Sequence, residues 1–304
     1  MALMQLRTSR RTVLKGAAVG AGAAALASCS AGSYGGRGVL SRRVSEVPLD
    51  PTAATWADTE YTDVVLGPQN AALPQRLAPA VTAVRVRSVH DGRQVGFRLE
   101  WTDDRPRDQT IRVDDYRDAC AVLLGPGDAD ANLRMMGTAE IPVTLLHWKA
   151  DWQRMLADGD EGLDAAFPNR TVDTYPVVHR VPPEEVGIES YVEADATEWL
   201  PAIHVGNPVA GRAVRTTSVE KAIAAGFSTT TSAGDQDATG RGERTDEGWQ
   251  VVIVKPLTPT EEGEIDLAPG TVSTCAFAVW SGSDRDAGSR KCPATEVAAL
   301  ELEE

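Results

Sequence analysis

The segment from Val81 to Trp101 alternates apolar and polar side chains with a period of two, and this pattern constrains the fold more than any other feature. Val84 and Val86 are separated by arginines, and the alternation returns from Val95 to Trp101. The two runs are joined through Asp91-Gly92, a dipeptide typical of tight hairpin turns. Because successive side chains of a strand point to opposite faces, the pattern predicts a hairpin with one buried face.

Other short apolar runs bounded by turn residues predict further strands, at Ala119–Leu124, Val143–Trp148, Gln250–Val254, Val272–Val279 and Val297–Leu302. Helical patterns are weaker, and the best are Lys149–Asp158 and Val219–Ala225. Many short strands with few helices favour a mainly β fold, an antiparallel two-sheet β-sandwich with a few short helices and long loops. We expect this domain to occupy residues 56–304.

The first 28 residues have the composition of a cleaved export signal. Arg10-Arg11 precedes an apolar run from Gly16 to Ala27, which is too short to cross a bilayer of roughly 30 Å as a helix. Paired arginines at this place are typical of the twin-arginine route, which exports folded proteins. The run ends in Leu26-Ala27-Ser28-Cys29, which resembles a lipoprotein cleavage site.

We therefore expect residues 1–28 to be a twin-arginine lipoprotein signal peptide and the mature chain to begin at a lipidated Cys29. Residues 29–55, rich in small and polar side chains at their start, are predicted to be a flexible tether. The protein would then be lipid-anchored at the outer face of the cytoplasmic membrane, on its periplasmic or extracellular side.

The net charge of the chain excludes one class of partner. The formal net charge of −14 argues against a nucleic-acid partner, because phosphates would be repelled.

Besides Cys29 the chain has Cys120, Cys275 and Cys292. Cys275 and Cys292 are the preferred disulfide pair in an oxidising compartment, and Cys120 could instead be a buried free thiol.

The usual motifs of exported redox and hydrolytic proteins are missing from the sequence. It has no Cys-x-x-Cys-His for covalent haem and no cysteine cluster for iron–sulfur ligation. The histidines, at positions 90, 147, 179 and 204, do not have metal-ligand spacing, and no Gly-x-Ser-x-Gly elbow or P-loop occurs. The sequence thus lacks an assembled nucleophile and base, so we expect no catalytic residues.

An ordered series of segments resembles the haem b-binding subunit of the ethylbenzene dehydrogenase and type II dimethyl sulfoxide reductase family. The series covers about residues 56 to 304, and its most specific part is Met136-Gly137-Thr138-Ala139-Glu140-Ile141-Pro142-Val143. The other segments are Val65–Gln69, Phe97–Asp103, Tyr116–Val122, Leu146–Ala150, Ala225–Thr229, Gly248–Leu257 and Phe277–Ser283.

The resemblance implies one non-covalent haem b inside the β-sandwich, with a methionine and a lysine as axial ligands of the iron. Carried over, the methionine is Met136, with Met135 as the alternative. The lysine is assigned to Lys255, which shares one face of an apolar strand with Val251 and Ile253. Lys149 is a competing lysine, and His147 is a weaker candidate ligand.

The resemblance further implies a non-catalytic electron-transfer subunit of an exported molybdenum oxidoreductase, which acts in anaerobic respiration or hydrocarbon oxidation. Its partners would be an iron–sulfur subunit, a molybdopterin catalytic subunit, the membrane through the lipid on Cys29, and a cytochrome b. The alternative is a cofactor-free ligand- or carbohydrate-binding lipoprotein of sandwich fold. The absorption spectrum would distinguish these two functions, because only the haem subunit would show a Soret band with α and β bands on reduction.

Overall fold

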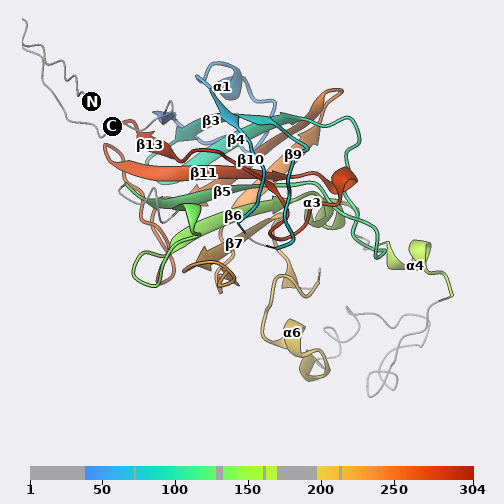
Figure 1. Ribbon diagram of the computed structural model, residues 1–304. Coiled ribbons are helices and arrows are strands. Elements are labelled where there is room, and N and C mark those ends of the chain that lie inside the picture. Colours follow the sequence, from blue (N-terminus) through green and yellow to red (C-terminus); the bar gives the residue numbers. More distant parts are fainter. Residues whose placement is uncertain (1–37, 72, 128–132, 160–161, 170–196, 212–213) are drawn as a thin grey trace, which may run out of the picture. The chain divides into compact units, whose positions relative to one another are not determined.

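A computed structural model describes residues 38–71, 73–127, 133–159, 162–169, 197–211 and 214–304. The predicted signal peptide and Cys29 lie outside these residues. The described part of the chain is mainly β, as predicted, and its hydrogen-bonded strands fold over into two facing layers (Figure 1).

The first layer has the order β8-β7-β6-β5-β11-β13, with the short β12 paired to β11. Its strands are β5 (Ala119–Pro126), β6 (Val143–Lys149), β7 (Val219–Ala224), β8 (Thr231–Ser232), β11 (Val272–Trp280), β12 (Cys292–Pro293) and β13 (Ala298–Leu302).

The second layer has the order β1-β3-β4-β10-β9, with β2 paired to β3. Its strands are β1 (Val39–Arg43), β2 (Thr62–Val65), β3 (Ala83–His90), β4 (Gln94–Thr102), β9 (Thr239–Arg244) and β10 (Gly248–Pro256). β1 joins the two layers by pairing in parallel with both β13 and β3. The sheet is therefore mixed, whereas we expected purely antiparallel strands.

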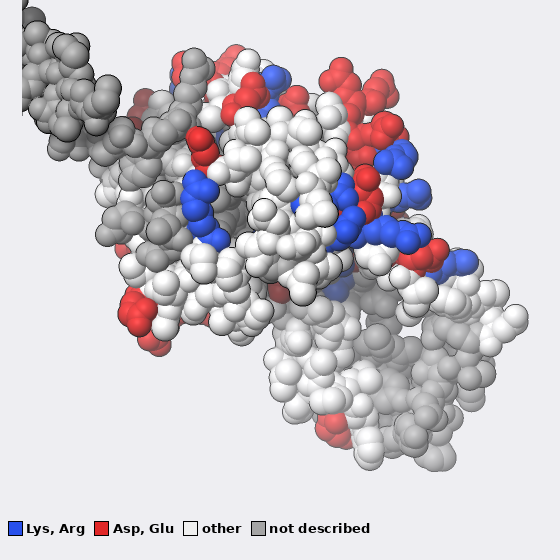
Figure 2. Space-filling model, in the orientation of Figure 1, with Lys and Arg blue, Asp and Glu red and all other residues white. Residues whose placement is uncertain are grey.

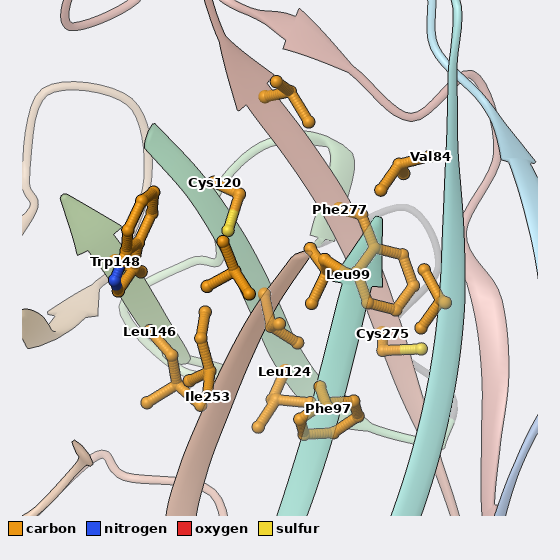
Figure 3. Packing of buried hydrophobic residues seen from close by; sticks show 14 of the residues in the cluster. Val84, Phe97, Leu99, Cys120, Leu124, Leu146, Trp148, Ile253, Cys275 and Phe277 are labelled. Carbon is orange, nitrogen blue, oxygen red and sulfur yellow. The ribbon is translucent and has the colours of Figure 1, made fainter. Parts of the chain in front are cut away.

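The predicted hairpin forms as β3 and β4, and its alternating apolar residues face the other layer. Figure 3 shows Phe97 and Leu99 among Leu124, Leu146 and Ile253, side chains that come from both layers. The space between the layers is closed by a tryptophan group in which the Trp148 ring lies edge-on to the rings of Trp249 and Trp101, with centroids 5.1 Å and 6.5 Å apart. The sandwich interior is thus filled by its own side chains.

Helices are few and short in the described residues: α1 (Ala54–Ala57), α3 (Ala150–Asp158), α4 (Leu163–Ala166), α6 (Pro201–His204) and the 3-10 turns η3 (Thr197–Trp199) and η5 (Gly282–Asp284). The helix predicted at Lys149–Asp158 is confirmed as α3. The one predicted at Val219–Ala225 is wrong, because this segment pairs with β6 along its whole length as β7. Pairing across the sheet decides the conformation of this short apolar run.

Two further expectations need correction. Part of the segment predicted as a flexible tether, Val39–Arg43, is a strand whose Val39 side chain is buried in the core. The preferred disulfide does not form, since Cys120, Cys275 and Cys292 are all free thiols. Cys292 lies opposite Val279, four residues or roughly 13 Å along β11 from Cys275, which is too far for a bridge.

Candidate functional site

A cavity of about 600 Å³ opens on the face of β5, β6 and β11 that points away from the sandwich core. Side chains of these strands line its floor, and the connections around residues 68–73, 133–136, 227–230 and 288–297 line its walls. Its lining is mostly apolar, as is typical of cofactor sites. This cavity therefore lies on an outer face of the sandwich, whereas the resemblance implies a haem inside it.

The strand register arranges the cavity floor in two rows of side chains. Ala276, Leu123 and Leu145 lie side by side in the first row. Ala278, Ala121 and His147 form the second row, two residues further along each strand. The two rows are about 6.7 Å apart. Alanines on β5 and β11 leave the space above the second row open, which makes room for a ligand there.

Met136 stands at the first-row end of the cavity. It lines the cavity and packs with Leu123, Leu145 and Ala276 in one apolar cluster. Its neighbour Met135 is 51% exposed and does not line the cavity. Of the two methionines that the sequence offers, the structure thus brings Met136 to the site.

The backbone at Met136 has an unusual conformation. Its φ is +61°, and Gly137 follows at +84°, so two successive residues are in the left-handed region. Only glycine adopts this conformation readily, and for methionine it costs about 1 kcal/mol or more. The Gly226 amide donates a 2.8 Å hydrogen bond to the Met136 carbonyl and holds this turn against the end of β7. Strain of this kind is typical of functional positions.

Lys291 lines the same cavity from the opposite end, just before β12. Its amine nitrogen lies 5.4 Å from the centroid of the Trp280 ring, and Trp280 follows the second row by two residues on β11. Burial lowers the pKa of Lys291 to about 8. A lysine with this pKa has a substantial neutral fraction near neutral pH and can then act as a nitrogen ligand.

The other three lysines in the described residues are engaged in ion pairs. The fully buried Lys255 amine lies 3.1 Å from a Glu264 carboxylate oxygen, and that carboxylate also accepts a 3.0 Å hydrogen bond from Lys221. Lys149 pairs with Glu220. None of the three lines the cavity. The structure therefore does not bring Lys255 to the site of Met136, and it leaves Lys149 on the β6 face beyond His147.

Burial also affects these engaged lysines. It lowers the pKa of Lys255 and lowers that of Lys149 to about 8. In both cases the nearby carboxylate opposes this shift by favouring the ammonium form. If either amine were withdrawn to bind a metal, a buried carboxylate would lose a partner, which is energetically costly. Lys291 has no such carboxylate pair among the described residues.

His147 sits in the floor of the cavity and stacks on Trp280, with ring centroids 4.5 Å apart. Burial, together with the positive charges of Lys149, Arg117 and Lys291, lowers its pKa well below the usual value. The imidazole is therefore neutral at physiological pH. Within the described residues its Nε2 atom is buried and has no hydrogen-bond partner.

The donor set of the cavity is unlike that of an ordinary metal-ion site. Within the described residues no group of three or more His, Cys, Asp or Glu side chains is placed to hold a metal ion. The cavity lining instead includes one thioether, that of Met136, and one lysine amine, that of Lys291. Such a pair fits a planar metal complex that supplies its own equatorial ligands.

Comparison with known proteins shows the family of this chain. The family model described as ethylbenzene dehydrogenase matches residues 53–292, most of the chain. The chain belongs to the ethylbenzene dehydrogenase family. The matched segment contains Met136, Lys255 and Lys291, so all three candidate ligands fall within the region common to the family.

A more specific relative within the curated proteins is ORF7 of Haloferax mediterranei, whose name assigns it provisionally as the haem subunit of a respiratory nitrate reductase. It is 23% identical over 147 residues, which cover 45% of this chain and 53% of ORF7. This chain thus matches about half the length of that relative.

Among solved structures, a family 9 carbohydrate-binding module of Caldicellulosiruptor kristjanssonii with bound cellotriose is 10% identical, with a TM-score of 0.39 over 87% of this chain and 93% of the module. The same module with glucose gives a TM-score of 0.37 at 10% identity, over 87% of this chain and 95% of the module.

Sequence reasoning missed Lys291. It lies in an irregular turn between Trp280 and the last strand, where periodicity gives no information about burial. A signal was nevertheless available, because the chain has only five lysines and otherwise uses arginine for its basic residues. The few lysines of the chain can therefore each be considered as a candidate ligand, and Lys291 is the one of the four described lysines that lines the cavity.

On the molecular surface, charges of both signs are interspersed. Figure 2 shows Lys and Arg beside Asp and Glu along one side of the visible face, while most of that face is uncharged. Within the described residues no helix is long and apolar enough to cross a membrane.

Proposed function

We propose that this chain is the haem b-binding electron-transfer subunit of an exported, membrane-associated molybdenum oxidoreductase. The observation that carries the proposal is the placement of Met136 and Lys291 at the two ends of one apolar cavity. Membership of the ethylbenzene dehydrogenase family and the name of ORF7 support a haem subunit. The partners would be an iron–sulfur subunit, a molybdopterin subunit and a membrane cytochrome b.

Met136 and Lys291 would hold one non-covalent haem b as its two axial ligands, and Lys291 takes the place first assigned to Lys255. When bound, the haem supplies a one-electron iron couple. The Met136 thioether would favour the ferrous state and so raise the reduction potential. If Met136 and Lys291 both held the iron, substrate would have no open coordination site there, which would suit an electron relay.

The Lys291 environment lowers the cost of making a neutral amine. With a pKa of about 8, deprotonation at pH 7 costs about 1.4 kcal/mol, whereas an unperturbed lysine at about 10.5 would need about 5 kcal/mol. The metal bond therefore has much less to offset at Lys291. At Lys255 the same step would also separate a buried ion pair with Glu264.

The cellular location is part of the proposal. A twin-arginine signal would export the protein in its folded state, and a lipid on Cys29 would hold it at the outer face of the cytoplasmic membrane, near quinone-linked carriers. Both features fall in residues 1–37, outside the described part of the chain.

The experiment is to purify the full chain after export from a host that makes haem. We expect a Soret band, sharp α and β bands on reduction, and one extractable haem b per chain. Colourless protein free of porphyrin, which also takes up no added haem, would contradict the proposal and favour the cofactor-free binding lipoprotein. Partners are tested by purifying the complex from native membranes and identifying the chains that accompany it.

A further inference from the structure

A charged side chain joins two walls of the cavity. Arg134 is exposed and lines the cavity from the wall that also carries Met136. Its Nη1 atom donates an exposed 3.0 Å hydrogen bond to the carbonyl oxygen of Thr295. The two chain neighbours of Thr295, Ala294 and Glu296, both line the cavity from the wall that follows β12. The guanidinium therefore lies at the rim of the cavity, where solvent and a ligand can reach it.

Both ends of this hydrogen bond are held by the backbone. The Met136 amide donates a 3.1 Å hydrogen bond to the Leu133 carbonyl and closes the turn that carries Arg134. The Thr295 amide donates a 2.9 Å hydrogen bond to the Val65 carbonyl. The guanidinium is thus held in place before any ligand arrives, which reduces the entropy cost of binding there. Arginine presents five N–H donors in a planar fork, so it can hold a carbonyl and bind a carboxylate as well.

The polarity of the lining favours one orientation of a porphyrin. Apart from His147, the two floor rows consist of alanines and leucines, so burying a carboxylate against them would be costly. Within the described residues, the charged side chains of the lining are Arg134, Lys291 and Glu296. Haem b has an apolar edge and an edge that carries two propionate carboxylates. The apolar edge therefore fits the floor, and the carboxylate edge fits the exposed rim.

We propose that Arg134 positions the bound porphyrin by pairing its guanidinium with a propionate carboxylate at the rim of the cavity. This inference rests on the proposed function and adds to it which edge of the porphyrin faces solvent. Arg134 is a positioning residue, because it does not hold the iron. It stands two residues before Met136, so the turn that presents the thioether also presents the cation. Glu296, exposed on the neighbouring wall, opposes this attraction with its negative charge.

The test compares protohaem with its dimethyl ester, in which both carboxylate charges are removed. Each is loaded onto the wild-type full chain and onto Arg134→Gln, and dissociation is followed by transfer to excess apomyoglobin. We expect the ester to leave the wild type about fivefold faster than protohaem, which is the effect of a well-formed exposed ion pair. The two should leave Arg134→Gln at nearly equal rates, while the low-spin bands of the bound haem stay unchanged.

Three variants serve for comparison. Arg42→Gln is the matched control, because the exposed Arg42 also donates to a main-chain carbonyl, that of Asp58, yet does not line the cavity. It should keep the full ester penalty. Arg134→Lys retains the charge without the planar fork and should keep part of the penalty. Glu296→Gln removes the opposing charge and should slow the release of protohaem without changing that of the ester.

Salt gives a second readout on the unaltered protein. Raising the ionic strength from about 0.1 M to about 1 M shortens the Debye length from about 10 Å to about 3 Å, and so weakens an exposed ion pair more than a buried contact. Protohaem should therefore leave the wild type faster at high salt, while release of the ester should change little. This comparison needs no variant, so it stands even if Arg134→Gln does not fold.

The outcomes are distinct. An ester penalty that persists unchanged in Arg134→Gln, or that does not respond to salt in the wild type, overturns the propionate contact while haem binding itself stands. Equal release of the two porphyrins from the wild type at low salt overturns it as well. Failure of the wild type to bind either porphyrin would contradict the proposed function.

Discussion

The backbone amide of Gly226, just beyond β7, donates a 2.8 Å hydrogen bond to the carbonyl of Met136, 90 residues earlier in the chain. This contact joins two of the segments that resemble the haem-subunit family. Met136 and Gly137 both adopt the left-handed conformation at this contact, which favours the glycine at position 137. The position of the Met136 side chain thus depends on a turn that is held from the end of β7.

Replacing Gly137 by alanine tests this turn. A Cβ at Gly137 would lie 2.6 Å from the Ala224 carbonyl oxygen, so the turn must shift. We expect the free energy of unfolding to fall by about 1 to 3 kcal/mol more than in Gly206→Ala, and haem to dissociate faster. Gly206 is the matched control because it also has positive φ, yet its added Cβ would meet no atom within 4 Å. Equal losses in thermal melting for the two variants would contradict the account.

The methionine assignment predicts different results for two adjacent residues. Met136→Ala should lose the low-spin spectrum and lower the reduction potential. It should also release haem at least about tenfold faster, because even mutation of a residue that only supports a metal ligand lowers metal affinity about 10- to 100-fold. Met135→Ala should leave all three unchanged, because Met135 is half exposed and outside the cavity. Spectroelectrochemistry of both variants makes the comparison. The reverse result would move the ligand to Met135.

Haem affinity should depend on pH through Lys291. The amine must lose a proton to bind iron, so below its pKa of about 8 the affinity falls about tenfold for each unit of decreasing pH, and above it the affinity levels off. His147 does not contribute, because its strongly lowered pKa keeps it neutral over this range. Equilibrium haem titrations between pH 6 and 9.5 measure the profile. An affinity that stays constant from pH 6 to 8 would rule out a titrating lysine ligand.

Lys255 has a structural role in this account. Its removal leaves Glu264 buried with Lys221 as its remaining cation. We therefore expect Lys255→Met to lower the free energy of unfolding by about 3 kcal/mol, measured by denaturant unfolding of the haem-free protein. Lys291→Met should change it little, since Lys291 has no carboxylate pair among the described residues. Equal stability of the two variants would show that the Glu264 pair does not matter.

The hairpin and five further strands, β5, β6, β10, β11 and β13, could be predicted because each has its own alternating or apolar run. β7 could not, since Lys221 and Glu220 interrupt its apolar pattern, and it becomes a strand only through pairing with β6 and the buried contact of Lys221 with Glu264. β1 was missed for a similar reason. Its short run gives no signal without β13 and β3 on its two sides.

The two proposed iron ligands also differ in how well local sequence predicts them. Met136 belongs to a local motif, and the glycine after it gives a visible sign of the turn. Lys255 has a clearer pattern than Lys291, because it completes one face of a buried strand, yet its amine pairs with Glu264 from the connection after that strand. Lys291 is only half-buried, and its surroundings come from segments that are far apart in sequence, so no local pattern encodes them.

The most direct measurement is the absorption spectrum of the haem-loaded full chain in two lysine variants. We expect Lys291→Ala to lose the sharp low-spin α and β bands, while Lys255→Ala, although less stable, keeps them once it is folded and loaded. Low-spin bands that persist in Lys291→Ala and disappear in Lys255→Ala would contradict the assignment of Met136 and Lys291 as the two residues that hold the iron.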